Sequence, residues 1–342
     1  MTRPTAVHLE LPADRPPWTP TGIDVRCGDR VTLLGSGRVA WPGGRGAGPK
    51  HHLWGRVPGG RIFGCPQDTA TVVADRSGPL ELCVYRGAWA DPSGALATGD
   101  RPYRGGRGGL AVTVLHWPAG IDPVDGLAGL GPQLVDPGLA AAERARLLDP
   151  VVPPAGWSYL LDTGPGEMFR QLPGPDAGIN VLSRDDAGIL AKPVGGADGV
   201  ALRPDTVLDW RWRVDALPGR GPEDAAAAHD LLGLALRFAD GHRLSWFWST
   251  ALRPEQDTFG CPTPRWAGRQ THVPVRRGPT GLGRWRRESR SVHADHERFV
   301  GPAPSRITAV ELIAVSHVGH GTGRARFAEI VLRHRDQRIR VL

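Results

Sequence analysis

The sequence predicts an all-β protein with two β-sandwich domains joined by a short helical linker. Three observations support this fold class. Short runs of alternating apolar and charged residues recur along the chain, and 47 Gly and 33 Pro provide turns and loops between them. No segment with helical periodicity is long enough to build a helical domain. The length of 342 residues suits two domains of ordinary size better than one small core.

The first domain is predicted over residues 1–117. The pair Gly28-Asp29 forms a turn between two apolar runs, and Gly-rich loops separate the later runs. This spacing is typical of a small β-sandwich. The expected strands cover 18–25, 30–37, 70–73, 80–85 and 110–116.

The opening motif of this domain is Trp18-x-x-Thr21-Gly22-Ile23-x-Val25-x-x-Gly28-Asp29-x-Val31, followed by a Gly-rich loop and a final strand. It resembles the galactophilic bacterial lectin family, whose members bind sugar through calcium. The resemblance implies a lectin fold and a set of oxygen ligands that includes an Asn pair just before the last strand.

The loop that corresponds to this calcium site, residues 103–110, has arginines and glycines where the Asn pair would lie. A fixed arginine charge opposes a divalent cation, so we expect the calcium site to be lost. Asp91, Thr98 and Asp100 in the preceding loop could still supply oxygen ligands.

A Gly/Pro-rich linker is predicted over residues 118–156. Within it, 137–148 has the composition of a short helix, and Asp136 is placed to cap its N-terminus. The proline-containing segment 149–154 ends this helix.

The second domain, residues 157–342, contains tryptophans at alternating positions. Apolar and charged residues alternate without a break over 208–215, which places Trp210 and Trp212 on one face of a strand and Arg211 and Arg213 on the other. Two further runs, 232–238 and 244–248, follow with a turn at Ala239-Asp240-Gly241, and the second contributes Trp246 and Trp248. The four rings are expected to meet, either as packed core or as the lining of a ligand pocket. The predicted substrate-binding residues are Trp210, Trp212, Trp246, Trp248, Arg211 and Arg213.

Later strands are expected over 271–276, 285–295, 307–316 and 325–332. Their order resembles a bacterial domain family of unknown function. The matching residues are Trp210-x-Trp212-x-Val214, His229-Asp230, Trp246 with Trp248, Trp285 through Arg290, Val292 and Asp295, and Phe327 through Ile330. The resemblance implies a jelly-roll sandwich like those of carbohydrate-binding modules, and no established activity.

Four residues are candidate catalytic groups: His229, Asp230, His272 and Arg276. An imidazole beside a carboxylate could transfer protons or polarise a carbonyl, although such a pair at a strand entry also satisfies loop amides. His272 and Arg276 are predicted to share a strand face, where Arg276 could bind an oxyanion or remain a surface charge. His293-x-Asp295 would offer two metal ligands on one strand, but no further ligand is visible. The sequence therefore assigns no metal site and no cofactor.

Charge and cysteine usage limit the partners and the location. The net charge is +7, from 42 Lys+Arg against 35 Asp+Glu, but the arginines are spread along the chain and interrupted by acids. We therefore predict no nucleic-acid partner and, without a long apolar run, no membrane partner. Residues 1–8 lack an apolar stretch of signal-peptide length, which favours a cytoplasmic protein.

The four cysteines form no disulfide framework or metal pattern, so reduced thiols are expected. The run Phe63-Gly64-Cys65-Pro66 recurs as Phe259-Gly260-Cys261-Pro262, which we interpret as two similar turns or chance.

Three functions remain. Signatures of serine hydrolases, kinases, nicotinamide enzymes and zincins are absent. The first hypothesis is a cofactor-independent enzyme of specialised metabolism that promotes cyclisation, isomerisation or elimination of a small-molecule substrate in an aromatic cavity. The alternative is a lectin-like carbohydrate-binding protein. A glycan hydrolase or lyase is the third, with Asp209, Asp215, Asp230 and Asp295 as possible paired carboxylates.

Overall fold

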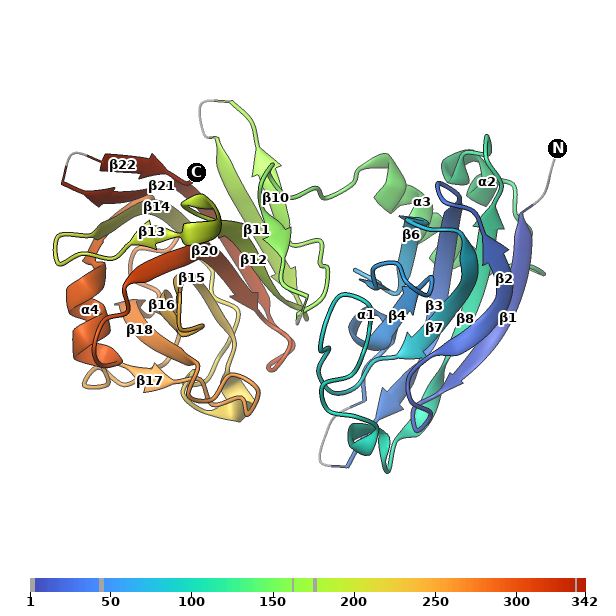
Figure 1. The fold of residues 1–342 in the computed structure, drawn as a ribbon, viewed down its shortest axis with the longest axis horizontal. Coiled ribbons are helices and arrows are strands. Elements are labelled where there is room, and N and C mark those ends of the chain that lie inside the picture. Colours follow the sequence, from blue (N-terminus) through green and yellow to red (C-terminus); the bar gives the residue numbers. More distant parts are fainter. Residues whose placement is uncertain (1–3, 43–45, 162, 175–176, 336) are drawn as a thin grey trace. The chain divides into compact units, whose positions relative to one another are not determined.

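The chain folds into two compact units, each built of two β-sheets (Figure 1). The computed structural model describes residues 4–42, 46–161, 163–174, 177–335 and 337–342, so the first three residues of the segment tested for a signal peptide lie outside the described ranges. Unit 1 comprises Met1–Val151 with Gly164–Glu167, and unit 2 comprises Val152–Thr163 with Met168–Leu342. The predicted all-β fold class is confirmed by these sheets.

Unit 1 is an antiparallel sandwich of two sheets, each of four strands in the described residues. The first sheet has the order β1 (Thr5–Pro12), β8 (Arg107–Trp117), β3 (Arg30–Ala40) and β6 (Thr69–Val73). The second has the order β2 (Thr19–Val25), β7 (Gly78–Val84), β4 (Leu53–Arg56) and β5 (Phe63–Gly64). Inward residues such as Leu33, Leu53, Leu82 and Leu110 are fully buried and form the core. All five strands expected from the sequence are present, and β1, β4 and β5 are additional.

Short helices complete unit 1. They are α1 (Pro49–His52), the 3-10 helix η1 (Arg101–Tyr103), α2 (Pro123–Ala128) and α3 (Pro137–Leu148). Helix α3 has the predicted bounds, and the Asp136 carboxylate accepts hydrogen bonds from the Gly138 and Leu139 amides at 2.7 and 3.0 Å. This confirms the predicted cap.

The segment that the sequence assigns to a linker packs on unit 1. Leu127, Val135 and Ala140 bury apolar surface against Leu115 and Trp117 of β8, which gives these helices a place in a hydrophobic cluster. The chain enters unit 2 only after Val151.

Unit 2 is a larger sandwich. In the described residues its smaller sheet has six strands, in the order β10 (Phe169–Leu172), β11 (Gly178–Arg184), β21 (Thr322–His334), β14 (Val207–Ala216) and β19 (Arg286–Ser291), with β22 (Gln337–Arg340) beside β21. Its larger sheet has eight, in the order β17 (Phe259–Gly260), β18 (Gln270–Arg277), β16 (Arg243–Ser249), β15 (Leu231–Phe238), β20 (Arg306–Val315), β12 (Ala187–Pro193) and β9 (Ser158–Tyr159), with β13 (Val200–Ala201) beside β20. Strands β16 and β18 are parallel, and the other described pairs are antiparallel.

Three short helices connect these strands: η2 (Gly196–Asp198), η3 (Ala226–Ala228) and α4 (Val292–Phe299). Helix α4 corrects the strand predicted over 285–295, which ends at Ser291 and continues as a helix. As a result His293 and Asp295 do not form the expected pair. Asp295 accepts hydrogen bonds from Trp246 and Arg290, whereas His293 lies 3.4 Å from Glu297.

The larger sheet of unit 2 is buried on both faces. One face packs against the smaller sheet through Leu232, Leu234 and Leu236. The other face carries Leu231, Phe247 and Ile313, which form a second apolar cluster with Leu252 and Phe259 from the loop that follows β16 and from β17. This loop layer also covers polar side chains of the sheet, among them the fully buried His272. No helix among the described residues is long and apolar enough to cross a membrane.

Candidate functional site

The four tryptophans predicted to meet do so in the core of unit 2. Their relative exposures are 1% for Trp210 and 0% for Trp212, Trp246 and Trp248. The ring centroids of Trp210 lie 6.0 Å from Trp212 and 6.2 Å from Trp246, and those of Trp212 and Trp248 are 5.6 Å apart. The rings are continuous with the main hydrophobic cluster. They therefore occupy the core, the first of the two roles that the sequence left open.

Three of the indole N–H groups have partners that explain how such large rings are accommodated. Trp246 donates to Asp295 at 2.7 Å, Trp212 to Glu288 at 3.0 Å, and Trp248 to the Gly278 carbonyl at 2.9 Å. A buried indole that keeps its hydrogen bond loses little on leaving water. The Trp210 N–H has no partner among the described residues.

Arg211 and Arg213 project from the opposite, exposed face of β14. Arg211 pairs with Glu329 at 2.7 Å and its guanidinium lies 4.5 Å from the Trp285 ring centroid, while Arg213 pairs with Asp215 at 2.7 Å. Because successive residues of a strand point to opposite faces, a ligand that touches these arginines cannot also lie among the core tryptophans. The predicted substrate-binding set is thus divided between two faces.

This exposed face carries a groove of about 320 Å³. It is lined by Asp209, Trp210, Arg287, Glu288, Ser289, Glu329, Val331 and Arg338. Glu329 holds the left-handed φ of +49° at an irregularity in the pairing of β14 with β21, and its carboxylate binds both Arg211 and Arg287, the latter at 2.8 Å. A non-glycine residue in this conformation is uncommon and is maintained by its surroundings.

Arg276 does not share a face with His272, which corrects the prediction. The pairing of β16 with β18 aligns Ser245 with His272 but shifts by one residue between Phe247 and Trp248, so that Arg276 lies opposite Trp248. A bulge of this kind reverses the side-chain direction of every later residue. Arg276 consequently forms an ion pair with Glu288.

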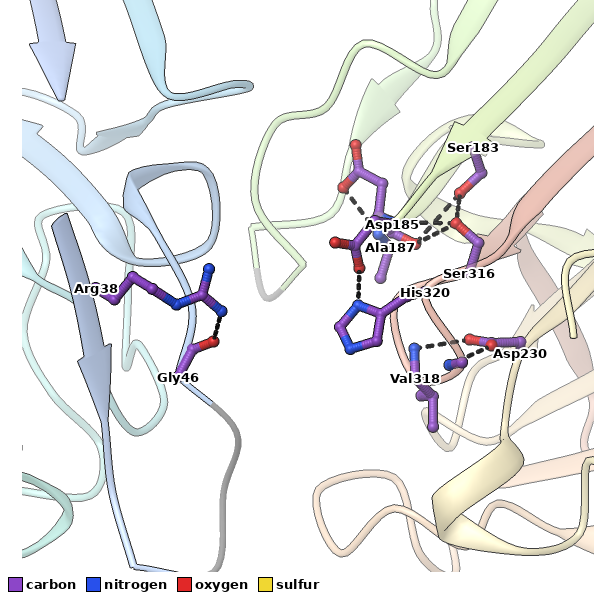
Figure 2. A network of polar contacts seen from close by, with 11 residues as sticks. Arg38, Gly46, Ser183, Asp185, Ala187, Asp230, Ser316, Val318 and His320 are labelled. Atoms are coloured by element: carbon purple, nitrogen blue, oxygen red, sulfur yellow. Dashed lines mark hydrogen bonds and ion pairs between the residues drawn. The ribbon is translucent and has the colours of Figure 1, made fainter. Parts of the chain in front are cut away.

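Asp230 forms hydrogen bonds with the backbone amides of a loop. The Asp230 carboxylate accepts hydrogen bonds from the amides of Val318 and Gly319 at 2.9 and 2.7 Å (Figure 2). This is the structural role that the sequence analysis set beside proton transfer.

Figure 2 also shows the polar contacts that hold the neighbouring turn. His320 pairs with Asp185 at 2.8 Å, and the hydroxyls of Ser183 and Ser316 are 2.6 Å apart. The same figure draws the hydrogen bond from Arg38 to the Gly46 carbonyl within unit 1.

The carboxylates considered for glycan hydrolysis each have a separate partner. Asp209 pairs with Arg333, Asp215 with Arg213, Asp230 with backbone amides, and Asp295 with Trp246 and Arg290. The structure does not bring any two of these four onto one partner.

His229 and His272 come together with a residue that the sequence analysis did not select, Cys261. His229 precedes β15, Cys261 follows β17, and His272 lies in β18. One donor atom from each residue lies within 4.8 Å of the other two, and the Cys261 Sγ is 3.4 Å from the His229 Nε2. In the described part of the chain, this is the one group of three His, Cys, Asp or Glu side chains that could hold a metal ion. We call it the His–Cys–His cluster.

The cluster is buried beneath the loop layer of the larger sheet. The relative exposures are 7% for His229, 4% for Cys261 and 0% for His272. Strand pairing sets this geometry, because β17 lies against β18 with Phe259 opposite His272 and the Cys261 amide donates to the Gln270 carbonyl at 2.9 Å. The Phe259 ring stacks on His272 with the centroids 4.9 Å apart.

Burial disfavours the protonated form of both imidazoles. Desolvation lowers the pKa of His229 below 6.5, outweighing its hydrogen bond to the Glu223 carbonyl and the nearby Asp230 charge. Desolvation also lowers the pKa of His272 well below 6.5, and the neighbouring His229 contributes in the same direction. Neutral imidazoles are the form that binds metals and accepts protons.

Cys261 lay in the repeated Phe-Gly-Cys-Pro run, which was the only sequence signal for it. The intervals from His229 to Cys261 and from Cys261 to His272 follow no short metal-binding pattern, because pairing between strands brings the three together.

The exposed Asp91, Thr98 and Asp100 of the possible calcium loop make local contacts. Asp91 accepts a hydrogen bond from the Ser93 amide at 2.7 Å, and Thr98 accepts one from the Ala88 amide at 3.3 Å.

A comparison with protein families agrees in part with the resemblance stated for the C-terminal half. A family described as "Protein of unknown function (DUF3047)" matches residues 254–331. These residues contain two members of the cluster, Cys261 and His272. No curated protein matches the chain.

Solved structures similar to this chain include a lectin domain, a xyloglucanase domain and a CBM22 tandem domain. One is "EclA N-terminal domain; PllA-like lectin", with 17% identity, 32% of this chain and 95% of that chain covered, and a TM-score of 0.26. A second is the xyloglucanase domain of NopAA from Sinorhizobium fredii in complex with cellobiose, with 8% identity, coverage of 54% and 96%, and a TM-score of 0.33. A third is the CBM22-1-CBM22-2 tandem domain of Xyn10C from Paenibacillus barcinonensis, with 10% identity, coverage of 89% and 79%, and a TM-score of 0.25. At these identities and TM-scores, no function is transferred from them.

Proposed function

We propose that this protein binds carbohydrate, and that unit 2 does so in the groove on the exposed face of β14, β19 and β21. The observation that carries the proposal is the composition of that groove. The residues that line its volume of about 320 Å³ include three acids, Asp209, Glu288 and Glu329, two arginines, Arg287 and Arg338, and the hydroxyl of Ser289. Planar carboxylates and guanidinium groups form paired hydrogen bonds, which suit the adjacent hydroxyls of a sugar ring.

The groove also offers apolar contact. Val331 lines it, and the half-buried Trp285 adjoins it through Arg211, which pairs with Glu329. Sugar rings have apolar C–H faces beside their hydroxyls, so a site with both kinds of surface matches them.

Arginines predominate among the charges of this face. They include Arg211, Arg213, Arg287, Arg333 and Arg338, against Asp209, Asp215 and Glu329. Such a surface attracts anions, so the proposed ligand is an acidic carbohydrate such as a uronic-acid oligosaccharide.

The full-length protein should be tested on an array of neutral and uronic-acid oligosaccharides, followed by calorimetric titration of those that bind. We expect uronic-acid ligands to bind, and Arg287→Ala and Glu329→Gln each to weaken binding by at least about tenfold, since a charge-assisted hydrogen bond contributes 1.5–3 kcal/mol. Arg253→Ala is the matched control, because the Arg253 and Arg287 side chains have the same 74% exposure. Failure of all arrayed sugars to bind, or binding by both groove variants as tight as that of the unaltered protein, would refute the proposal.

The cyclase or isomerase hypothesis receives less support. It required an aromatic cavity lined by Trp210, Trp212, Trp246 and Trp248, and these rings pack against one another in the core. The geometry therefore favours the carbohydrate-binding alternative.

A further inference from the structure

We propose that His229, Cys261 and His272 form a binding site for a thiophilic divalent transition-metal ion, with zinc as the best fit. The site lies under the loop layer of the larger sheet of unit 2, separate from the groove on the smaller sheet. Imidazole nitrogen and thiolate sulfur are both ligand types that zinc binds, and the thiolate disfavours hard cations such as magnesium and calcium. The proposal therefore stands independently of carbohydrate binding.

The hydrogen bond of His229 to a backbone carbonyl leaves the Nε2 atom unprotonated, with a lone pair that can bind a metal ion. Its Nδ1 lies 2.7 Å from the Glu223 carbonyl oxygen, which can only accept, so Nδ1 carries the proton. The Nε2 lone pair then faces the Cys261 sulfur at 3.4 Å. A backbone carbonyl that fixes the tautomer in this way is the usual outer partner of a metal-bound histidine.

His272 shows the same arrangement with a serine. Its Nδ1 lies 2.6 Å from the Ser245 hydroxyl, which can itself donate to the Thr271 carbonyl at 3.3 Å. The Nε2 of this fully buried ring has no hydrogen-bond partner among the described residues. Leaving a buried polar atom without a partner costs about 1–3 kcal/mol, and a bound ion is one of the few ways to recover it.

The donor spacing is close to that of a tetrahedral site. With zinc–nitrogen bonds of about 2.0–2.1 Å and a zinc–sulfur bond of about 2.3 Å, ligand atoms in a tetrahedron lie about 3.3–3.6 Å apart. The His229–Cys261 separation of 3.4 Å already meets this range, and all three donors fit within 4.8 Å. The Thr263 hydroxyl, 2.9 Å from the sulfur, borders the remaining coordination position.

Such an ion would join three segments distant in sequence. The thiol proton of Cys261 would leave to solvent as the zinc–sulfur bond forms, which makes binding weaker at low pH. The ion would fasten the loop after β17 and the segment before β15 to strand β18. Because the donors are buried, the site would be filled during folding.

The test uses the full-length protein. It should be produced with zinc in the medium for elemental analysis, and unfolded and refolded with Co²⁺ for absorption spectroscopy. We expect one zinc per chain and, with Co²⁺, thiolate-to-metal charge transfer in the near-ultraviolet with visible bands of a four-coordinate ion. Cys261→Ser should remove the charge-transfer band, and His272→Asn should lower the metal content.

Cys65→Ser is the matched control, because Cys65 is an equally buried thiol in the other copy of the Phe-Gly-Cys-Pro run and should leave metal binding unchanged. If a cluster variant fails to fold, the cobalt spectrum of the unaltered chain still decides. Absence of stoichiometric zinc together with absence of a cobalt–thiolate band would overturn the proposal and leave a thiol–imidazole hydrogen bond. Sugar binding would not be affected by that result.

Discussion

A single half-buried imidazole, His52, makes the stability of unit 1 depend on pH. Desolvation lowers the pKa of His52 from 6.5 to about 4, and the charges of His51 and Arg86 act in the same direction against its hydrogen bond to the Tyr85 carbonyl. The unfolded chain binds this proton at higher pH than the folded chain does. Stability from His52 is therefore complete above about pH 6.5 and is lost as the pH falls towards 4.

We expect thermal unfolding of the full chain by calorimetry to show this loss between about pH 6.5 and about pH 4, with His52 contributing a slope of up to about 1.4 kcal/mol per pH unit. His52→Gln should reduce the slope, since an amide keeps a donor for the Tyr85 carbonyl but does not titrate. His8→Gln, at an exposed histidine bonded to Thr113, should not. An unchanged slope in His52→Gln would show that other groups are responsible.

Individual residues were the least predictable feature. The sequence singled out His229 and His272 but could not indicate that they meet, because strand pairing over long intervals does so. Cys261 was visible only in a repeated four-residue run that had no functional meaning by itself. The outward and inward positions of Arg211 and Trp212, in contrast, follow directly from period-two alternation.

At the scale of elements, β14 combines a core face and a ligand face in one strand. Trp212 is fully buried, contacts Trp210, Trp248 and Phe327, and donates to Glu288. Its neighbour Arg211 pairs at the surface with Glu329 and lies over the Trp285 ring. The two side chains should therefore control different properties.

Trp212→Ala should lower the free energy of unfolding by about 3–5 kcal/mol, because it removes a fully packed aromatic side chain and leaves a cavity. Arg211→Ala should change it by less than about 1 kcal/mol, since an exposed ion pair contributes little, while weakening binding of acidic sugars. Denaturant unfolding and calorimetric titration measure the two quantities. Loss of sugar binding in Trp212→Ala with stability retained would instead identify the tryptophans as a pocket.

Elements were predicted well wherever the alternating pattern was unbroken, as in 208–215, 232–238 and 244–248. The prediction failed at irregularities. One residue inserted in β18 turned Arg276 away from His272, and a bulge of one residue leaves no periodic signature. Helix α4 was taken for strand because Val292 and Asp295 were assigned to the end of an alternating run.

At the scale of the whole molecule, the boundary between the two units does not fall at a single position in the sequence. The chain leaves unit 1 after Val151, contributes residues up to Thr163 to unit 2, returns for Gly164–Glu167, and then continues as unit 2. Glu167 pairs with Arg146 at 2.7 Å within unit 1. Sequence composition could not reveal that residues 152–163 belong to unit 2 and residues 164–167 to unit 1, since both segments have the composition of an ordinary linker.

A fragment that begins at residue 152 should fold as unit 2, whereas one that begins at 168 should be less stable. The longer fragment keeps Trp157, which is 6% exposed in the main core, and Tyr159, whose hydroxyl accepts hydrogen bonds from the Met168 and Phe169 amides at 3.2 and 3.3 Å. Strand β9 also pairs with β12 through Tyr159 and Leu190. Loss of the tryptophan alone should cost about 3–5 kcal/mol.

Denaturant unfolding of the fragments 152–342 and 168–342, with Trp157→Ala in the longer one, separates these contributions. We expect the point variant to account for most of the difference, because the core contact of Trp157 outweighs the two bonds and one short strand pairing that Tyr159 supplies. Equal stability of the two fragments would mean that residues 152–163 belong to unit 2 by position only. If instead the longer fragment does not fold, unit 2 depends on residues of unit 1, and the division of the chain into two folding units is wrong.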